Sequence, residues 1–252
     1  MLNKIIYPGL IFILAFSIGC NDEKPQLEPQ AQPEVSEFQV KINHQFGEDS
    51  FKLNQEYTLA SQELVKYSRI SYILSNFYLI QEDSSIFNID DSYMLVDLKN
   101  TENIIQFDSV PIGNYLGIGF SIGLDSATNH GNPNLYAANH PLSPINNSLH
   151  WSWQGGYIFS AIEGKTILNK SSFSFHLAGI NNKIDVELPY RFSKKEAKLI
   201  ATMTYHVNEI FDGPSVYNIE TDGASTHNTE SPATKKLIQN MKNNLFLLEN
   251  IK

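Results

Sequence analysis

Strand-forming runs separated by turn residues recur along most of this chain. The longest, residues 67–80 (YSRISYILSNFYLI), has no Pro or Gly and is rich in Tyr, Ile and Phe, so it predicts one long strand or two strands with a bend. Residues 38–42 alternate apolar and polar side chains, as a half-buried strand does. Further strands are expected at residues 92–97, 104–107, 115–122, 156–163, 172–177, 183–188, 198–206 and 215–219. Short strands punctuated by Asn, Asp, Gly and Pro are typical of an antiparallel sandwich or barrel, so we expect an all-β fold.

One long segment, residues 125–149, breaks this pattern. It is rich in Asn, Pro, Ser and His and has little periodicity, and insertions of this length in a compact domain are usually functional or disordered. It contains His130 and leads directly into residues 150–157 (HWSWQGGY), which hold both tryptophans of the chain. Two indoles beside a histidine and two glycines suit either a surface that holds a ligand or a corner of an ordinary core.

The C-terminal region has the features of a helix. Ser231 is a suitable N-cap, and Pro232 suits the first helical turn. Apolar residues follow at helical spacing, namely Leu237, Ile238, Met241 and Leu245. We expect a short C-terminal helix that covers an open face or edge of the sheet.

The first 20 residues have the layout of a secretory signal, with a lysine near the start, an apolar run at residues 10–16 and small residues before Cys20. Residues 17–20 (SIGC) resemble a bacterial lipobox, in which the cysteine becomes the lipidated first residue of the mature protein. The alternative is a plain signal peptide with an incidental cysteine. We expect lipidation at Cys20.

Residues 21–36 are rich in Pro, Gln and Glu and predict a disordered tether. Residues 37–252 are numerous enough to form one large domain with a substantial core. We therefore expect an outer-membrane lipoprotein, attached to the membrane through its N-terminal lipid and facing the periplasm or the cell surface.

Composition excludes several classes of site. Cys20 is the only cysteine, so a lipidated protein would have no free thiol, which rules out disulfides and cysteine-based zinc or iron–sulfur sites in the domain. The net charge is −9 and the lysines are scattered, so nucleic acid is not an expected partner. We expect the domain to be monomeric.

The seven histidines form no local metal-binding pair, since none lies two or four positions from another. A metal site would have to be assembled from distant strands and loops. The Gly-x-Ser-x-Gly and P-loop motifs of common enzymes are also absent from the sequence. No catalytic residue can be assigned, and we expect a binding protein rather than an enzyme.

Five short motifs stand out along the domain: residues 123–130 (GLDSATNH), 143–146 (SPIN), 151–157 (WSWQGGY), 175–179 (FHLAG) and 210–214 (IFDGP). In this order and at this approximate spacing they resemble the methanobactin-associated MbnP family. The tryptophan motif is the most specific, and the similarity runs from the strand that ends at His44 to Pro214. The resemblance implies an exported copper-binding β-sandwich with long loop insertions.

In this family and in related copper proteins, Cu(I) is held by imidazoles. A tryptophan can be oxidised to kynurenine, whose amino nitrogen then joins the site, and a dihaem peroxidase-like partner would carry out that oxidation. The composition agrees, because a thiol-free exported protein has imidazole and thioether left for copper, and imidazole suits copper.

Position by position, the resemblance implies copper-ligand roles for three histidines and modified or site-lining roles for two tryptophans: His44, His130, His176, Trp151 and Trp153. His150 stands where the family more usually has another residue, and we treat it as a candidate substitute ligand. Many relatives end in a His-x-His-like segment, whereas this chain ends in LLENIK. If those terminal histidines contribute to the site, this member binds copper weakly or is a scaffold with a vestigial site.

Each of these residues also has a structural interpretation. His44 and His176 could satisfy buried backbone groups at strand ends. Trp151 and Trp153, two positions apart on a strand, would face the same side and could plug one end of the sandwich.

The competing function is a surface lipoprotein that binds a carbohydrate or another organic ligand through the paired tryptophans, with Asn, Gln and His donors from the long segment. Copper binding requires imidazole nitrogens that converge to about 2 Å from a common point. Carbohydrate binding requires an exposed flat indole and no such convergence.

Overall fold

The computed structural model describes residues 35–100, 102–152, 155–195, 198–226 and 229–252. The signal peptide with Cys20, the tether up to residue 34 and Trp153 lie outside the described residues. What the sequence predicts for them stays a prediction.

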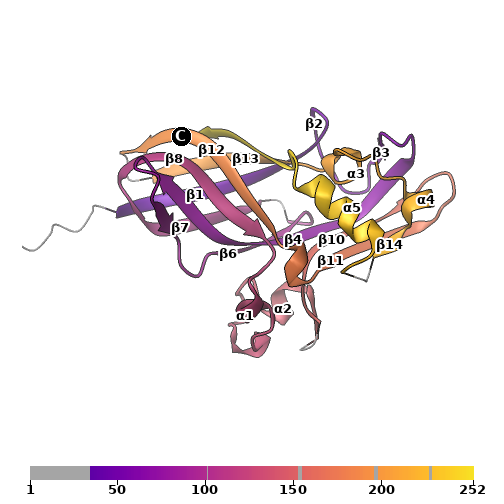
Figure 1. Ribbon diagram of the computed structural model, residues 1–252, viewed down its shortest axis with the longest axis horizontal. Coiled ribbons are helices and arrows are strands. Elements are labelled where there is room, and N and C mark those ends of the chain that lie inside the picture. Colours follow the sequence, from indigo (N-terminus) through magenta and orange to yellow (C-terminus); the bar gives the residue numbers. More distant parts are fainter. Residues whose placement is uncertain (1–34, 101, 153–154, 196–197, 227–228) are drawn as a thin grey trace, which may run out of the picture. The chain divides into compact units, whose positions relative to one another are not determined.

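Strands dominate the described part of the chain (Figure 1). The strands are β1 (Val35–Phe46), β2 (Asp49–Ser50), β3 (Glu56–Thr58), β4 (Leu64–Gln81), β5 (Ile86–Asn88), β6 (Tyr93–Asp97), β7 (Ile104–Pro111), β8 (Gly113–Ile122), β9 (His150–Ser152), β10 (Gly156–Thr166), β11 (Ser172–Ala178), β12 (Ile184–Lys194), β13 (Lys198–His206), β14 (Ser225–Thr226) and β15 (Phe246–Ile251). The helices are α1 (Ser126–Asn129), η1 (Pro133–Leu135), α2 (Pro144–Asn147), η2 (Ile180–Asn182), α3 (Glu209–Asp212), α4 (Ile219–Asp222) and α5 (Pro232–Met241).

The strands form two sheets. The first has the order β15-β13-β1-β2, with β7 also paired to β1. The second has the order β12-β8-β4-β10-β11-β14, with β3, β5 and β6 paired to β4 and β9 paired to β10. The mostly-β sandwich expected from the sequence is confirmed. Its pairing is mixed rather than purely antiparallel, because β1 runs parallel to β13 and β11 runs parallel to β14.

The longest predicted run forms a single strand, β4, which pairs with β8 on one side and β10 on the other. Ile70, Tyr72 and Leu74 belong to the main core, whereas Ile73 belongs to a second, smaller core. Successive residues of a strand point to opposite faces. Both faces of β4 are therefore covered, one by the first sheet and the other by the long insertion.

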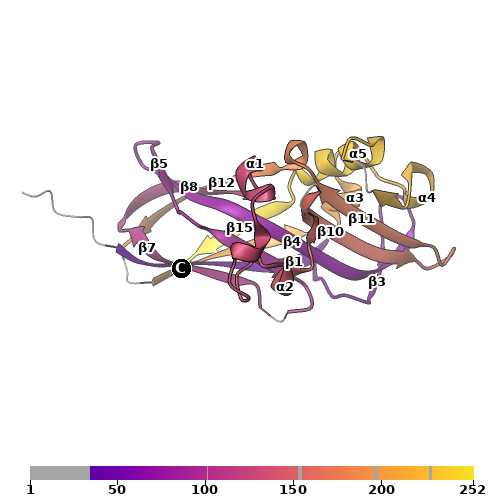
Figure 2. The same cartoon turned by 90° about the horizontal axis from the view of Figure 1, so that it is seen from below.

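The insertion has more local structure than its composition suggests. It forms α1, η1 and α2 and leads into β9. Leu142 and Leu149 of the insertion, with the flanking Leu124 and Tyr157, belong to the smaller core around Ile73. Figure 1 shows α1 and α2 on one side of β4 and β10, and Figure 2 shows them lying across these strands. The insertion is thus packed against the outer face of the second sheet.

The C-terminal helix is confirmed as α5, with Ser231 at its N-cap accepting a hydrogen bond from the backbone N–H of Thr234. Its buried side chains include Leu237 and Met241. The helix is not the last element, because β15 follows it and adds an edge strand to β13. The sequence reading missed this strand.

The strand predicted at residues 215–219 is wrong. Tyr217 lies between α3 and α4, where its backbone N–H donates to the carbonyl of Phe211 and its hydroxyl donates to the carbonyl of Gly223. These bonds turn the segment back on itself instead of leaving its backbone free to join a sheet. In the described part of the chain, no helix has the length and apolarity needed to cross a membrane.

Candidate functional site

The described tryptophan, Trp151, lies near two of the predicted ligands. Its ring centroid is 6.1 Å from that of His176, which projects from β11. Trp151 also lines a pocket of about 340 Å³ together with His130, and the far wall of this pocket includes residues 179–181. The Trp151 side chain is 40% exposed, so it is accessible from solvent rather than sealed in a core.

His130 follows α1 and is held in a defined orientation. Its Nδ1 lies 2.9 Å from the carbonyl oxygen of Ser126. Because a carbonyl only accepts, Nδ1 must carry the hydrogen, which leaves the Nε2 lone pair on the opposite side of the ring. The side-chain amide of Asn129 lies 3.5 Å from that nitrogen, a long contact consistent with an unprotonated Nε2. His130 thus lines the pocket that it shares with Trp151, with its Nδ1 held by Ser126 and its Nε2 on the other side of the ring.

His176 is part of a charged cluster on the outer face of the second sheet. Its Nε2 donates to Glu163 Oε1 at 2.9 Å, and the Arg69 guanidinium donates to the same oxygen at 3.2 Å. Partial burial acts to raise the pKa of Glu163, but the hydrogen bond from His176 and the positive charge of Arg69 outweigh it and lower that pKa. An ionised Glu163 accepts only, so the hydrogen of His176 stays on Nε2.

His44 lies on the other side of the same sheet. On β4, Ser71 faces outward with Arg69, which donates to its hydroxyl, whereas Tyr72 faces the main core. His44 Nε2 lies 2.8 Å from the Tyr72 hydroxyl, and its ring contacts Tyr205 at 5.4 Å. The second sheet therefore separates His44 from His176.

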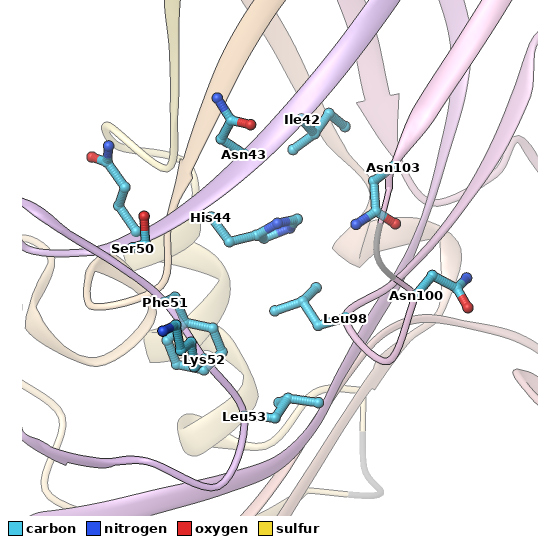
Figure 3. Close-up of a pocket in the computed structure, with 11 residues that line it drawn as sticks. Ile42, Asn43, His44, Ser50, Phe51, Lys52, Leu53, Leu98, Asn100 and Asn103 are labelled. Atoms are coloured by element: carbon cyan, nitrogen blue, oxygen red, sulfur yellow. The ribbon is translucent and has the colours of Figure 1, made fainter.

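The environment of His44 keeps its ring neutral. Burial lowers the pKa of His44 to about 4. The ring lines a pocket of about 600 Å³, in which it faces Asn103 (Figure 3). A neutral imidazole can donate or accept a hydrogen bond, and it can bind a metal.

The remaining two histidines of this region pack against tyrosines of the insertion. His150 contacts the Tyr157 ring edge to face at 4.7 Å, and burial lowers its pKa. His140 stacks on Tyr136 at 4.4 Å, and its Nδ1 accepts a hydrogen bond from the backbone N–H of Leu142. Both imidazoles take part in packing that holds the insertion together. His150 precedes Trp151 on β9, so the two side chains leave the strand on opposite sides.

The motif at residues 123–130 contacts the motif at residues 151–157 through the side chain of Asn129. The buried Asn129 side chain accepts a hydrogen bond from the backbone N–H of Tyr157 at 2.9 Å. Gly156 has a φ of +64°, and a Cβ atom there would lie 2.5 Å from the Asn129 amide. A Cβ atom would prevent this approach, so glycine at residue 156 lets the segment after β9 pack against Asn129, the neighbour of His130.

The described His, Cys, Asp and Glu side chains do not by themselves form a complete metal site. Among the described residues, no three His, Cys, Asp or Glu side chains are grouped closely enough to hold a metal ion. What the structure does bring together is one indole, Trp151, with the His176 ring at 6.1 Å and with His130 in the lining of a shared pocket. This arrangement fits copper only if Trp151 supplies a further donor.

The sequence reading missed Arg69 and Glu163, the partners of His176. Both are ordinary charged residues in strands, and no local motif marks them. Only the strand register brings these residues together. Glu163 is the Cα partner of Arg69 on one neighbouring strand and of Ser174 on the other.

Comparison with known proteins gives a consistent picture. The family model described as MbnP matches residues 35–231. The solved structure of MbnP from Methylosinus trichosporium is similar in fold, with a TM-score of 0.54 and 16% sequence identity over 80% of this chain and 87% of that chain. None of the curated proteins compared with the chain matches it.

Proposed function

The chain belongs to the MbnP family, and we propose that it is an exported, lipid-anchored, non-catalytic protein that binds copper for acquisition or storage. The observation that supports this best is that Trp151 lies 6.1 Å from the His176 ring and lines one pocket with His130. Imidazole is a suitable ligand for copper, and the Nε2 lone pair of His130 is directed away from its hydrogen-bonded side.

The missing donor would come from Trp151 itself. Oxidation of its indole by two equivalents of hydrogen peroxide would break the C2–C3 bond of the five-membered ring and give N-formylkynurenine and two water molecules. Hydrolysis would then release the carbon as formate and free the aromatic amine of kynurenine, a net loss of one carbon atom and gain of one oxygen atom. Trp151 is 40% exposed, which leaves it accessible to an external oxidant. A dihaem peroxidase-like partner is the proposed catalyst of this oxidation. With kynurenine at residue 151, an amine would join the imidazoles of His130 and His176, and Cu(I) would have the nitrogen ligands that it accepts.

The first test uses protein purified from its own host. Metal analysis is expected to find copper, and mass spectrometry of the peptide containing Trp151 is expected to show the kynurenine product. Protein that carries neither copper nor the modification would instead support the scaffold with a vestigial site.

The second test compares histidine variants. His130→Gln is expected to weaken Cu(I) binding by more than about tenfold, the loss that even an orienting group in a metal site produces. Affinity would be measured by competition with a chromophoric Cu(I) chelator. His206→Gln is the matched control, because His206 ends β13 and does not line the Trp151 pocket. Equal losses in both variants would contradict the assignment of His130.

Because the Trp151 indole is exposed, carbohydrate binding, the alternative function, can be tested as well. If the host protein lacks copper and a carbohydrate perturbs Trp151 fluorescence, Trp151 is a stacking platform and the copper proposal fails. Trp151→Phe separates the outcomes, since it removes the source of the amine but keeps a flat ring.

A further inference from the structure

A second pocket lies between β1 and the loops that join β2 to β3 and β6 to β7. Its volume is about 600 Å³, within the range of small-molecule sites. It shares no lining residue with the pocket at Trp151. A ligand bound here would therefore be independent of the proposed copper site.

The polar lining of this pocket is composed of uncharged groups and one lysine. The lining residues are Ile42, Asn43, His44, Gln45, Ser50, Phe51, Lys52, Leu53, Leu98, Asn100 and Asn103. No Asp or Glu is among them, although the chain carries 27 acidic residues and 18 basic ones. A cation would find no carboxylate here, which argues against a metal or an amine as the ligand.

Asn103 is the most informative residue. It is 9% exposed, and within the described part of the chain its side-chain amide makes no hydrogen bond to protein. Figure 3 shows this amide and the His44 ring directed toward each other across the pocket, with Leu98 beneath them. The amide atoms are open to the pocket rather than sealed in the protein, so they are available to hydrogen-bond a ligand that enters.

His44 lies opposite Asn103. Its Nε2 lies 2.8 Å from the Tyr72 hydroxyl, and its ring lines the pocket. The ring therefore offers a hydrogen-bonding edge to a ligand. Asn100 places a further amide at the mouth, and Leu98 provides an apolar surface.

From this geometry we infer that the pocket binds a small carbohydrate, at the size of a disaccharide. Carboxamides donate and accept at the same time, as do the vicinal hydroxyls of a sugar. A neutral imidazole can complete such a network, and an apolar side chain can cover a C–H face. The ligand class follows from the absence of carboxylates in the lining together with the unpaired amides.

The experiment uses the full-length protein in a detergent without a sugar headgroup, so that the detergent does not compete. Maltose, cellobiose and lactose are titrated to millimolar concentration by calorimetry, with the His44 imidazole NMR signals as a local reporter. At least one disaccharide is expected to bind saturably and to shift the His44 signals.

Asn103→Leu is expected to abolish binding, because it replaces the buried amide by an apolar group of similar size. Asn100→Leu, at the exposed mouth, is expected to weaken binding and serves if Asn103→Leu does not fold. Asn134→Leu is the control, since Asn134 is exposed on the insertion and outside the pocket. Absence of binding by all three disaccharides, or binding that survives both pocket variants, would overturn the inference. Copper content is measured in parallel and is expected not to change, which separates a failure here from a failure of the copper proposal.

Discussion

Ser71 and Tyr72 are neighbours in β4, yet their side chains belong to different parts of the molecule. Ser71 faces the Arg69, Glu163 and His176 cluster, whereas Tyr72 holds His44 in the main core. A step of one residue in a strand reverses the face that a side chain joins. Histidines that look equivalent in the sequence are therefore separated by a sheet.

Burial of His44 makes stability depend on pH. Its pKa is about 4 in the folded protein and 6.5 in the unfolded chain, so between these values the unfolded state binds more protons. The contribution of His44 is present above pH 6.5 and is lost as the pH falls toward 4, by as much as about 3 kcal/mol at about 1.4 kcal/mol per pKa unit. Urea unfolding at a series of pH values measures this loss.

His44→Gln is the matched variant, because glutamine keeps hydrogen-bonding groups but does not titrate. Its stability is expected to fall less steeply between pH 6.5 and 4 than that of the wild type. Identical slopes for the two proteins would show that His44 is not the group responsible.

At the scale of elements, the insertion is organised by contacts between its two ends. Asn129, in the motif at residues 123–130, accepts a hydrogen bond from the backbone N–H of Tyr157, in the motif at residues 151–157. The Tyr157 hydroxyl in turn donates to the carbonyl of Leu142 at 2.6 Å. These buried bonds explain why a segment poor in periodicity is ordered: side chains, rather than a regular backbone ladder, satisfy its polar groups.

A substitution at Gly156 tests whether the contact with Asn129 orders the insertion. Gly156→Ala is expected to destabilise the protein by about 1–3 kcal/mol, because alanine at a positive φ is strained and its Cβ would also collide with Asn129. It is also expected to weaken Cu(I) binding, since it moves Trp151 relative to His130. Denaturant unfolding and chelator competition measure the two effects.

Gly113→Ala is the control for this substitution. Gly113 lacks a positive φ, and a Cβ atom there would meet Tyr115 atoms no closer than 4.0 Å. Alanine is expected to be tolerated at residue 113. A comparable loss of stability at both glycines would mean that contact with Asn129 is not the cause.

At the scale of the whole domain, the last strand connects the two sheets through one side chain. Phe246 of β15 packs edge to face against Tyr205 of the first sheet at 5.1 Å and against Phe120 of the second sheet at 5.0 Å. It is 6% exposed, whereas the next residue, Leu247, is 54% exposed. The C-terminus is thus a structural part of the sandwich.

Phe246→Ala is expected to lower the free energy of unfolding by about 3–5 kcal/mol, as removal of a buried phenylalanine usually does. Leu247→Ala, one position away on the solvent side, is expected to change it by less than about 0.5 kcal/mol. Thermal and urea unfolding of both variants measure the difference. A small effect of Phe246→Ala would show that β15 does not hold the sheets together.

The sequence by itself determined most of the longer strands, the C-terminal helix start at Ser231 and the membership of the family, because strand periodicity, capping residues and motif order are all local properties. It missed β15 and wrongly predicted a strand at residues 215–219. It located the insertion and its tryptophan motif, but it could not pair His176 with Glu163 or place His44 across a sheet from it. Those relations depend on strand register and on which face each side chain takes, and they arise only when segments distant in sequence pack together. Tertiary structure alone decided that Trp151 lies near His176 and shares a pocket with His130, and that the His44 ring lines a separate pocket.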